Sequence, residues 1–110
     1  MATLFKNKLY SALGIVETTG LTTESNAKTT VIGLSLTNLT SSIILVSIRI
    51  VDTVGSTSAY YVKETVIPPS QSLRVINGGE KLVLGPSTEI KITASTAASL
   101  DMVLSYVEIV

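Results

Sequence analysis

The sequence predicts an all-β protein: a single β-sandwich of about eight mostly antiparallel strands, with immunoglobulin-like or jelly-roll topology. Three observations support this. Apolar and polar residues alternate along most of the chain, turn-forming residues recur about every ten residues, and no stretch has the period of a long amphipathic helix. A chain of 110 residues can bury one core. We therefore assign residues 1–110 to one sandwich domain, with residues 1–8 as an N-terminal arm.

The first strand is predicted over residues 8–18, with Leu9, Leu13 and Ile15 on one face. Residues 20–28 are mostly polar, so we expect a connection there rather than a strand.

Residues 29–37 and 43–51 predict a hairpin at the centre of the domain. If Leu36 lies opposite Ile44, the apolar residues of both strands share one sheet face. A one-residue slip in this register would turn the apolar residues of the second strand to the opposite face. That shared face would hold Ile32, Leu34, Leu36, Ile44, Val46, Ile48 and Ile50.

The opposite face of residues 43–51 carries Ile43, Leu45, Ser47, Arg49 and Val51. A free monomer would not need apolar side chains at both ends of a solvent-facing strand, so this surplus predicts contact with an outside partner.

The remaining strands are predicted over residues 59–66, 72–76, 81–84, 88–94 and 100–109. Asn77-Gly78-Gly79-Glu80 is a strong hairpin signal, and a four-residue loop would pair Val75 with Leu82 and Leu73 with Leu84. Of the last two strands, the first should bury Ile90 and Ile92, and the second Met102, Leu104 and Tyr106.

The composition narrows the classes of function. The chain lacks Cys, His and Trp, so we expect no disulfide, no metal and no cofactor. Its net charge is zero, which predicts neither nucleic-acid nor membrane binding, and the sequence shows neither a signal peptide nor an apolar run long enough for a spanning helix. Charged residues make up only 15%, which favours association with other protein surfaces.

The sequence contains no catalytic motif, and we predict that the protein is not an enzyme. Nucleophilic catalysis through a Ser-His or Cys-His pair is impossible without His or Cys. The eight acidic residues are scattered, and we expect them to be solvated. Arg49 is expected to be a solvated edge charge, with an acid on a neighbouring subunit as the alternative partner. Asn38-Leu39-Thr40 fits the glycosylation pattern, which chance explains in a Thr-rich chain.

The candidate functional residues are therefore interface residues, with no catalytic, cofactor or metal residue among them. They are Phe5, Ile43, Leu45, Val51 and Tyr61. Tyr61 is included because Tyr60 and Tyr61 point to opposite faces of a strand, so one ring is available as an interface anchor.

Five segments of the chain carry a resemblance: VIGLSLTNLT (31–40), IRIVD (48–52), IPPS (67–70), GEKLVL (79–84) and LSYVEI (104–109). Together they resemble small β-sandwich virion structural proteins of tailed bacteriophages, which are found on capsids, necks and tails. The resemblance extends from about residue 29 onward. It implies a non-catalytic building block of the virion and supplies no catalytic or binding residue to transfer.

On this resemblance we expect a phage structural protein that assembles in multiple copies, as a capsid decoration (cement) protein or a neck or tail component. Its partners would be other copies of itself and major capsid, neck or tail subunits. The alternative is a β-sandwich binding module for adhesion or glycan recognition, on a virion fibre or a cell surface. That alternative predicts aromatic residues clustered at one end of the sandwich.

Overall fold

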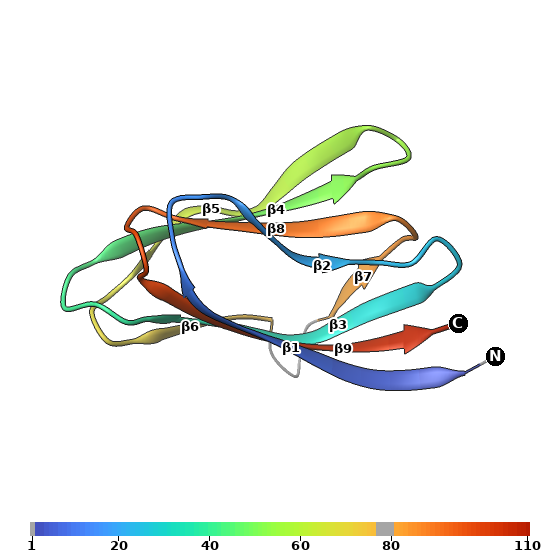
Figure 1. Cartoon of the computed structure of the whole chain (residues 1–110), viewed down its shortest axis with the longest axis horizontal. Coiled ribbons are helices and arrows are strands. Elements are labelled where there is room, and N and C mark those ends of the chain that lie inside the picture. The colour runs from blue at the N-terminus through green and yellow to red at the C-terminus, as the bar shows by residue number, and fades with distance from the viewer. Residues whose placement is uncertain (1, 77–80) are drawn as a thin grey trace.

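The computed structural model in Figure 1 describes residues 2–76 and 81–110. The described residues form β-strands and no helix: β1 (Thr3–Leu13), β2 (Thr18–Thr22), β3 (Lys28–Asn38), β4 (Ile44–Asp52), β5 (Thr57–Ile67), β6 (Ser72–Ile76), β7 (Leu82–Leu84), β8 (Thr88–Ala94) and β9 (Leu100–Ile109). No helix long and apolar enough to cross a membrane occurs in this part of the chain.

The strands form two antiparallel sheets that face each other (Figure 1). The lower sheet has the order β1–β9–β3–β6, with β7 also paired to β3, and the upper sheet has the order β2–β8–β4–β5. The first strand pairs with the last, the second with the next to last, and so on inward: β1–β9, β2–β8, β3–β6/β7 and β4–β5. Successive pairs lie alternately in the lower and the upper sheet. This is a jelly roll. The predicted sandwich is confirmed, and of the two topologies expected the jelly roll is the one observed.

The core lies between the inner faces of the two sheets. In β8 and β9 every second residue is buried, as the alternation predicted, and Ile90, Ile92 and Leu104 are essentially inaccessible. Ile44, Val46 and Ile48 supply the core from β4. Full burial of each such side chain stabilises the fold by about 1.5–3 kcal/mol relative to exposure. The core is therefore large enough to hold the fold without a disulfide or a metal.

The predicted central hairpin is wrong. Strand β3 ends at Asn38 in the lower sheet, and β4 begins at Ile44 in the upper sheet. Leu36 and Ile44 both face the core, but from opposite sheets. Ile32 is only half-buried because a register shift between Val31 and Gly33 changes the face on which the following residues lie.

The predicted hairpin around Asn77-Gly78-Gly79-Glu80 is also wrong in its pairing. Strand β6 pairs with the end of β3, where Leu73 lies opposite Leu36, and β7 pairs with the start of β3, where Leu82 lies opposite Val31. The two short strands therefore follow one another along β3 as one interrupted edge strand. The turn itself lies outside the described residues.

The first strand differs from its prediction in both position and facing. Leu13 is buried, but Leu9 and Ile15 are exposed. Leu9 faces outward because of a bulge between Tyr10 and Leu13, where Ala12 has a φ of 55° and its backbone N–H donates to Asp101 Oδ1 at 3.0 Å. Ile15 is exposed because it lies in the loop after β1, which ends at Leu13. Strand β2 lies largely in the segment predicted as a polar connection.

Residues 3–8, part of the expected N-terminal arm, form the first half of β1. They pair with β9, from Thr3 opposite Ile109 to Lys8 opposite Leu104. Ala2 and Val110 exchange two backbone hydrogen bonds at 2.7 and 2.9 Å, so the two ends of the described chain lie side by side (Figure 1).

Candidate functional site

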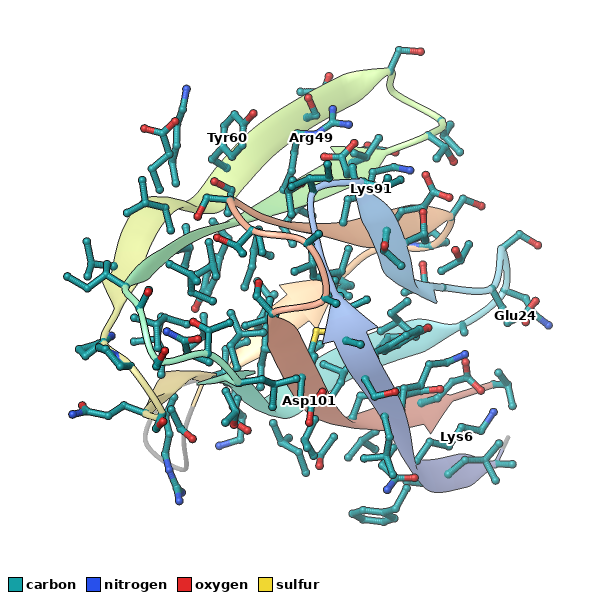
Figure 2. The ribbon with its side chains drawn as sticks, turned by 60° about the vertical axis from the view of Figure 1, so that its left-hand side comes forward. Lys6, Glu24, Arg49, Tyr60, Lys91 and Asp101 are labelled. Atoms are coloured by element: carbon teal, nitrogen blue, oxygen red, sulfur yellow. The ribbon has the colours of Figure 1, made fainter. Side chains whose placement is uncertain are left out.

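The outer face of the upper sheet carries several charged side chains, and most of them are paired with a neighbour. Arg49 binds Glu17 through two hydrogen bonds, Nε to Oε2 at 3.1 Å and Nη2 to Oε1 at 2.7 Å. Lys91 Nζ lies 3.8 Å from Glu89 Oε1, and Lys63 Nζ lies over the Tyr60 ring, 4.8 Å from the ring centroid. Figure 2 shows Arg49, Tyr60 and Lys91 together on this sheet. Because Arg49 pairs within the chain, our expectation of a solvated charge or an acid on a neighbouring subunit was wrong.

The ion pair between Arg49 and Glu17 changes the pKa of both residues. Hydrogen bonding from Arg49 lowers the pKa of Glu17, and hydrogen bonding to Glu17 raises the pKa of Arg49. The pair joins the β1–β2 loop to β4, so its ionised form holds two elements together.

A second ion pair lies at the start of β1. Lys6 Nζ lies 2.8 Å from Glu108 Oε1, and this hydrogen bond raises the pKa of Lys6. Glu108 is only 7% exposed, so the prediction that all the acids are solvated is wrong here. Neither ion pair resembles a catalytic dyad, and the described residues contain no acidic cluster that could hold a metal ion.

The outer face of the lower sheet has a different character, and we call it the lower outer face. Register places Phe5 beside Val107, Leu9 beside Val103, and Asn7 beside Ser105. On the next strand, Thr30, Gly33 and Ser35 continue these rows. The charged residues on this face are Lys28 at the start of β3, Arg74 on β6 and Asp101 at the start of β9 (Asp101 is labelled in Figure 2). This face is therefore mainly apolar and small-polar.

The third surface is the loop end, made of residues 14–17, 39–43, 68–71 and 95–99 and drawn at the left of Figure 1. Ile15, Val16 and Ile43 are 63%, 75% and 61% exposed there, and Leu39 is 48% exposed. The loops carry a single charged side chain, Glu17, which is neutralised by Arg49.

Backbone hydrogen bonds join the four loops of the loop end into one rigid platform. Ser99 N donates to Leu13 O, Leu39 N to Ser99 O, and Ser70 N to Thr40 O, all within 3.1 Å. A surface held in one conformation loses little entropy when a partner covers it.

Asn38 is the central residue of this platform. Its side-chain NH₂ donates to the carbonyl oxygens of Ser42, Ile67 and Pro68 at 2.8, 3.0 and 3.1 Å. Its Oδ1 accepts from Thr40 N at 2.8 Å. The residue is 1% exposed, so its amide serves as a structural cross-link rather than as a glycan acceptor.

The five predicted interface residues do not form one patch. Ile43 and Leu45 are exposed and lie at or next to the loop end, whereas Phe5 lies on the lower outer face. Val51 is half-buried on β4, and Tyr61 is half-buried against the core.

Sequence reasoning missed four surface residues: Leu9, Ile15, Val16 and Gly33. Alternation alone places Leu9 and Ile15 on the same face as Leu13, but the bulge turns Leu9 outward and Ile15 lies beyond the end of β1. Gly33 was visible only as a glycine inside a strand, which signals a bulge or a close approach to the backbone.

No protein-family model and no curated protein matches the sequence. Among solved structures, the chain is similar to part of the T13 infectious bursal disease virus particle, with a TM-score of 0.55, 10% identity, and coverage of 96% of this chain and 30% of that chain. For a chain of the Gx strain of the same virus the TM-score is 0.52 and the identity 9%, over 96% of this chain and 35% of that chain. For a subunit of the disulfide-linked pili of Bacillus endospore appendages the TM-score is 0.50 and the identity 11%, over 96% of this chain and 86% of that chain.

These similarities establish the fold. The chain spans about a third of the viral chains that it matches and most of the pilus chain. The jelly roll also occurs in lectins and cupins, so the fold alone does not assign a function.

Proposed function

We propose that the protein is a non-catalytic structural subunit of a virion that assembles in many copies, either as a capsid decoration protein or as a neck or tail component of a tailed phage. The observation that carries the proposal is the contrast between the two outer faces. The charged side chains of the upper face are mostly paired with one another, whereas the lower outer face and the loop end are mainly apolar and small-polar, with few charges. Burial of such surface costs little desolvation of charge.

The virion setting is supported by the resemblance of residues 29–110 to small phage virion proteins and by the viral particles among the structures with this fold. Decoration would act mechanically. Each copy would add modest contacts to its neighbours, and the repetition of these contacts over a particle would stabilise the whole.

A second candidate is the subunit of a filamentous surface appendage. It is favoured by the similarity to the Bacillus appendage pilin, most of whose length this chain covers. Because the chain has no Cys, its copies would not be linked by disulfides. The glycan-binding alternative gains no such support, because Phe5 and Tyr60 lie on opposite faces and Tyr106 is buried.

Multi-angle light scattering and negative-stain microscopy of the purified protein test the proposal. We expect a concentration-dependent assembly of several copies, with closed or short oligomers for a virion component and long filaments for an appendage subunit. A protein that stays monomeric at about 100 µM, a concentration at which even weak specific contacts are populated, would contradict the proposal.

A further inference from the structure

We infer that the lower outer face is a self-association surface, on which Phe5 of one copy fills a hollow on the lower outer face of a second copy. This inference rests on the proposed function and makes it specific, because it names both the partner and the contact. Phe5, which we call the knob, and the hollow both lie on the lower outer face of each copy.

The knob is Phe5. Its side chain is 79% exposed, the largest exposed fraction among the large apolar side chains that the structure describes. It lies on β1, opposite Val107 of β9, so one side of the ring rests on an apolar neighbour. An aromatic ring on the surface of a strand has little to gain in a monomer, but it is a common anchor in interfaces.

The hollow lies around Gly33 on β3 and Ser105 on β9, which are paired. Because one residue lacks a side chain and the other has a short one, the face dips between the larger side chains around it. Its volume is about 280 Å³, and the residues that line it include Ile32, Ser35, Arg74 and Val103. That volume accommodates an aromatic side chain.

A second copy is the partner that this arrangement fits. Phe5 and Gly33 lie on β1 and β3, which flank β9, and pair with residues two apart on β9, so they are about 12 Å apart. A twofold rotation that brings two lower outer faces together can place each Phe5 over the hollow of the other copy, making the contact twice.

The charges agree with this choice. Arg74 borders the hollow, and Asp101 lies two strands away from β6, on β9. The two residues have opposite signs, so two copies rotated by a twofold axis need not place like charges together. A small-molecule site would need several convergent polar groups, and the polar side chains lining the hollow are Ser35, Arg74 and Ser105.

Two variants test the inference. Phe5→Ala removes the knob. Gly33→Val fills the hollow, and it should fold because a Cβ at Gly33 would meet its nearest atom, Ser105 Cβ, at 3.7 Å, an ordinary contact. We expect the dissociation constant from sedimentation velocity to rise by about 30-fold or more in each variant. The control Val54→Ala trims another highly exposed apolar side chain, in the β4–β5 turn, and should leave the constant unchanged.

The decisive measurement mixes the two variants. A mixed dimer keeps one intact contact, because Phe5 of the Gly33→Val copy enters the open hollow of the Phe5→Ala copy, while each variant alone keeps none. Dimers should therefore reappear on mixing. If both variants still assemble like the wild type, the face is not the interface, although the structural role stands. If the wild type is itself monomeric, the inference and the proposed function both fail.

Discussion

Asn38 is the residue on which most of the loop end depends. Its buried amide has two N–H hydrogens for three carbonyl acceptors, so one hydrogen is shared, and the side chain ties the β3–β4 loop to the β5–β6 connection. The bond to Ile67 O is buried, whereas the bonds to Ser42 O and Pro68 O are partly buried.

We therefore expect Asn38→Ala to destabilise the fold by about 2–3 kcal/mol, since one buried and two partly buried carbonyl groups lose this donor. Urea unfolding measures the loss. Asn26→Ala, at an exposed position in the β2–β3 loop, is the matched control and should stay within about 0.5 kcal/mol of the wild type. Equal effects of the two substitutions would show that the cross-link carries no stability.

Thr29 presents the opposite situation. Its Oγ1 is buried without a hydrogen-bond partner in the described part of the chain, and its side chain is 1% exposed. Thr29→Val replaces the hydroxyl with a methyl group of similar size and should stabilise the fold by about 1 kcal/mol. Thr30→Val, half-buried on the outer side of the same strand, should gain less. A lower melting temperature for Thr29→Val would show that the hydroxyl has a partner after all.

At the scale of elements, the β1–β2 loop is packed against the β8–β9 loop without room to spare. A Cβ added at Gly14 would lie 2.9 Å from Ala98 N and 3.0 Å from Ala97 Cα, both backbone atoms. A Cβ at Gly85, in the β7–β8 turn, would meet nothing closer than Thr88 Oγ1 at 3.9 Å.

Gly14→Ala should therefore cost about 1–3 kcal/mol, because two loops must move apart, whereas Gly85→Ala should be neutral or slightly stabilising. Thermal unfolding of both variants checks this. Hydrogen exchange at Ser99 N–H, which bonds to Leu13 O, should accelerate in Gly14→Ala alone. Equal stability of the two variants would contradict the close packing of the loops.

The Glu17–Arg49 pair predicts how the attachment of the same loop depends on pH. The pKa of Glu17 is lowered below its ordinary value of 4.5, so the pair stabilises the fold above that pH and loses its effect as pH falls through the lowered pKa. Glu17→Gln should thus be less stable than the wild type at neutral pH, by a small amount because the pair is partly exposed. The difference should shrink as the pH falls through that lowered pKa, because Glu17 then becomes protonated.

Urea unfolding at several pH values follows this difference. Glu24→Gln is the control, since Glu24 is exposed in the β2–β3 loop. A gap between Glu17→Gln and the wild type that persists at the lowest pH would mean that the substitution acts through packing rather than charge.

At the scale of the whole molecule, alternation predicted which residues are buried better than it predicted which strands pair. Strands β8 and β9 were predicted with their observed bounds, because Ile90, Ile92 and Met102 alternate without interruption. The β3–β4 hairpin failed because both sheets of a sandwich present apolar inner faces with the same period, so Leu36 and Ile44 look alike whether their strands pair or face each other.

The surface could be predicted only in part. Ile43 and Leu45 were found because they break the alternation, and both are exposed. Phe5 was predicted as an interface residue in the N-terminal arm, but its partner hollow depends on Gly33 lying beside Ser105, a pairing between strands distant in sequence. The bulge at Ala12, which exposes Leu9, depends on Asp101, far along the chain. Such long-range contacts leave no local sequence signal.

The difference between the two outer faces predicts how assembly responds to salt. If copies meet through the lower outer face, which carries few charges, the dissociation constant should change less than about twofold between about 0.05 M and 0.5 M NaCl. Sodium sulfate should tighten the association and cooling should weaken it, because apolar burial drives it. An interface on the upper sheet would instead involve Arg49, Lys91 and Glu89, whose existing pairs would have to be rearranged. A tenfold or greater weakening by NaCl in sedimentation velocity would therefore assign the interface to the upper sheet and contradict the role of Phe5.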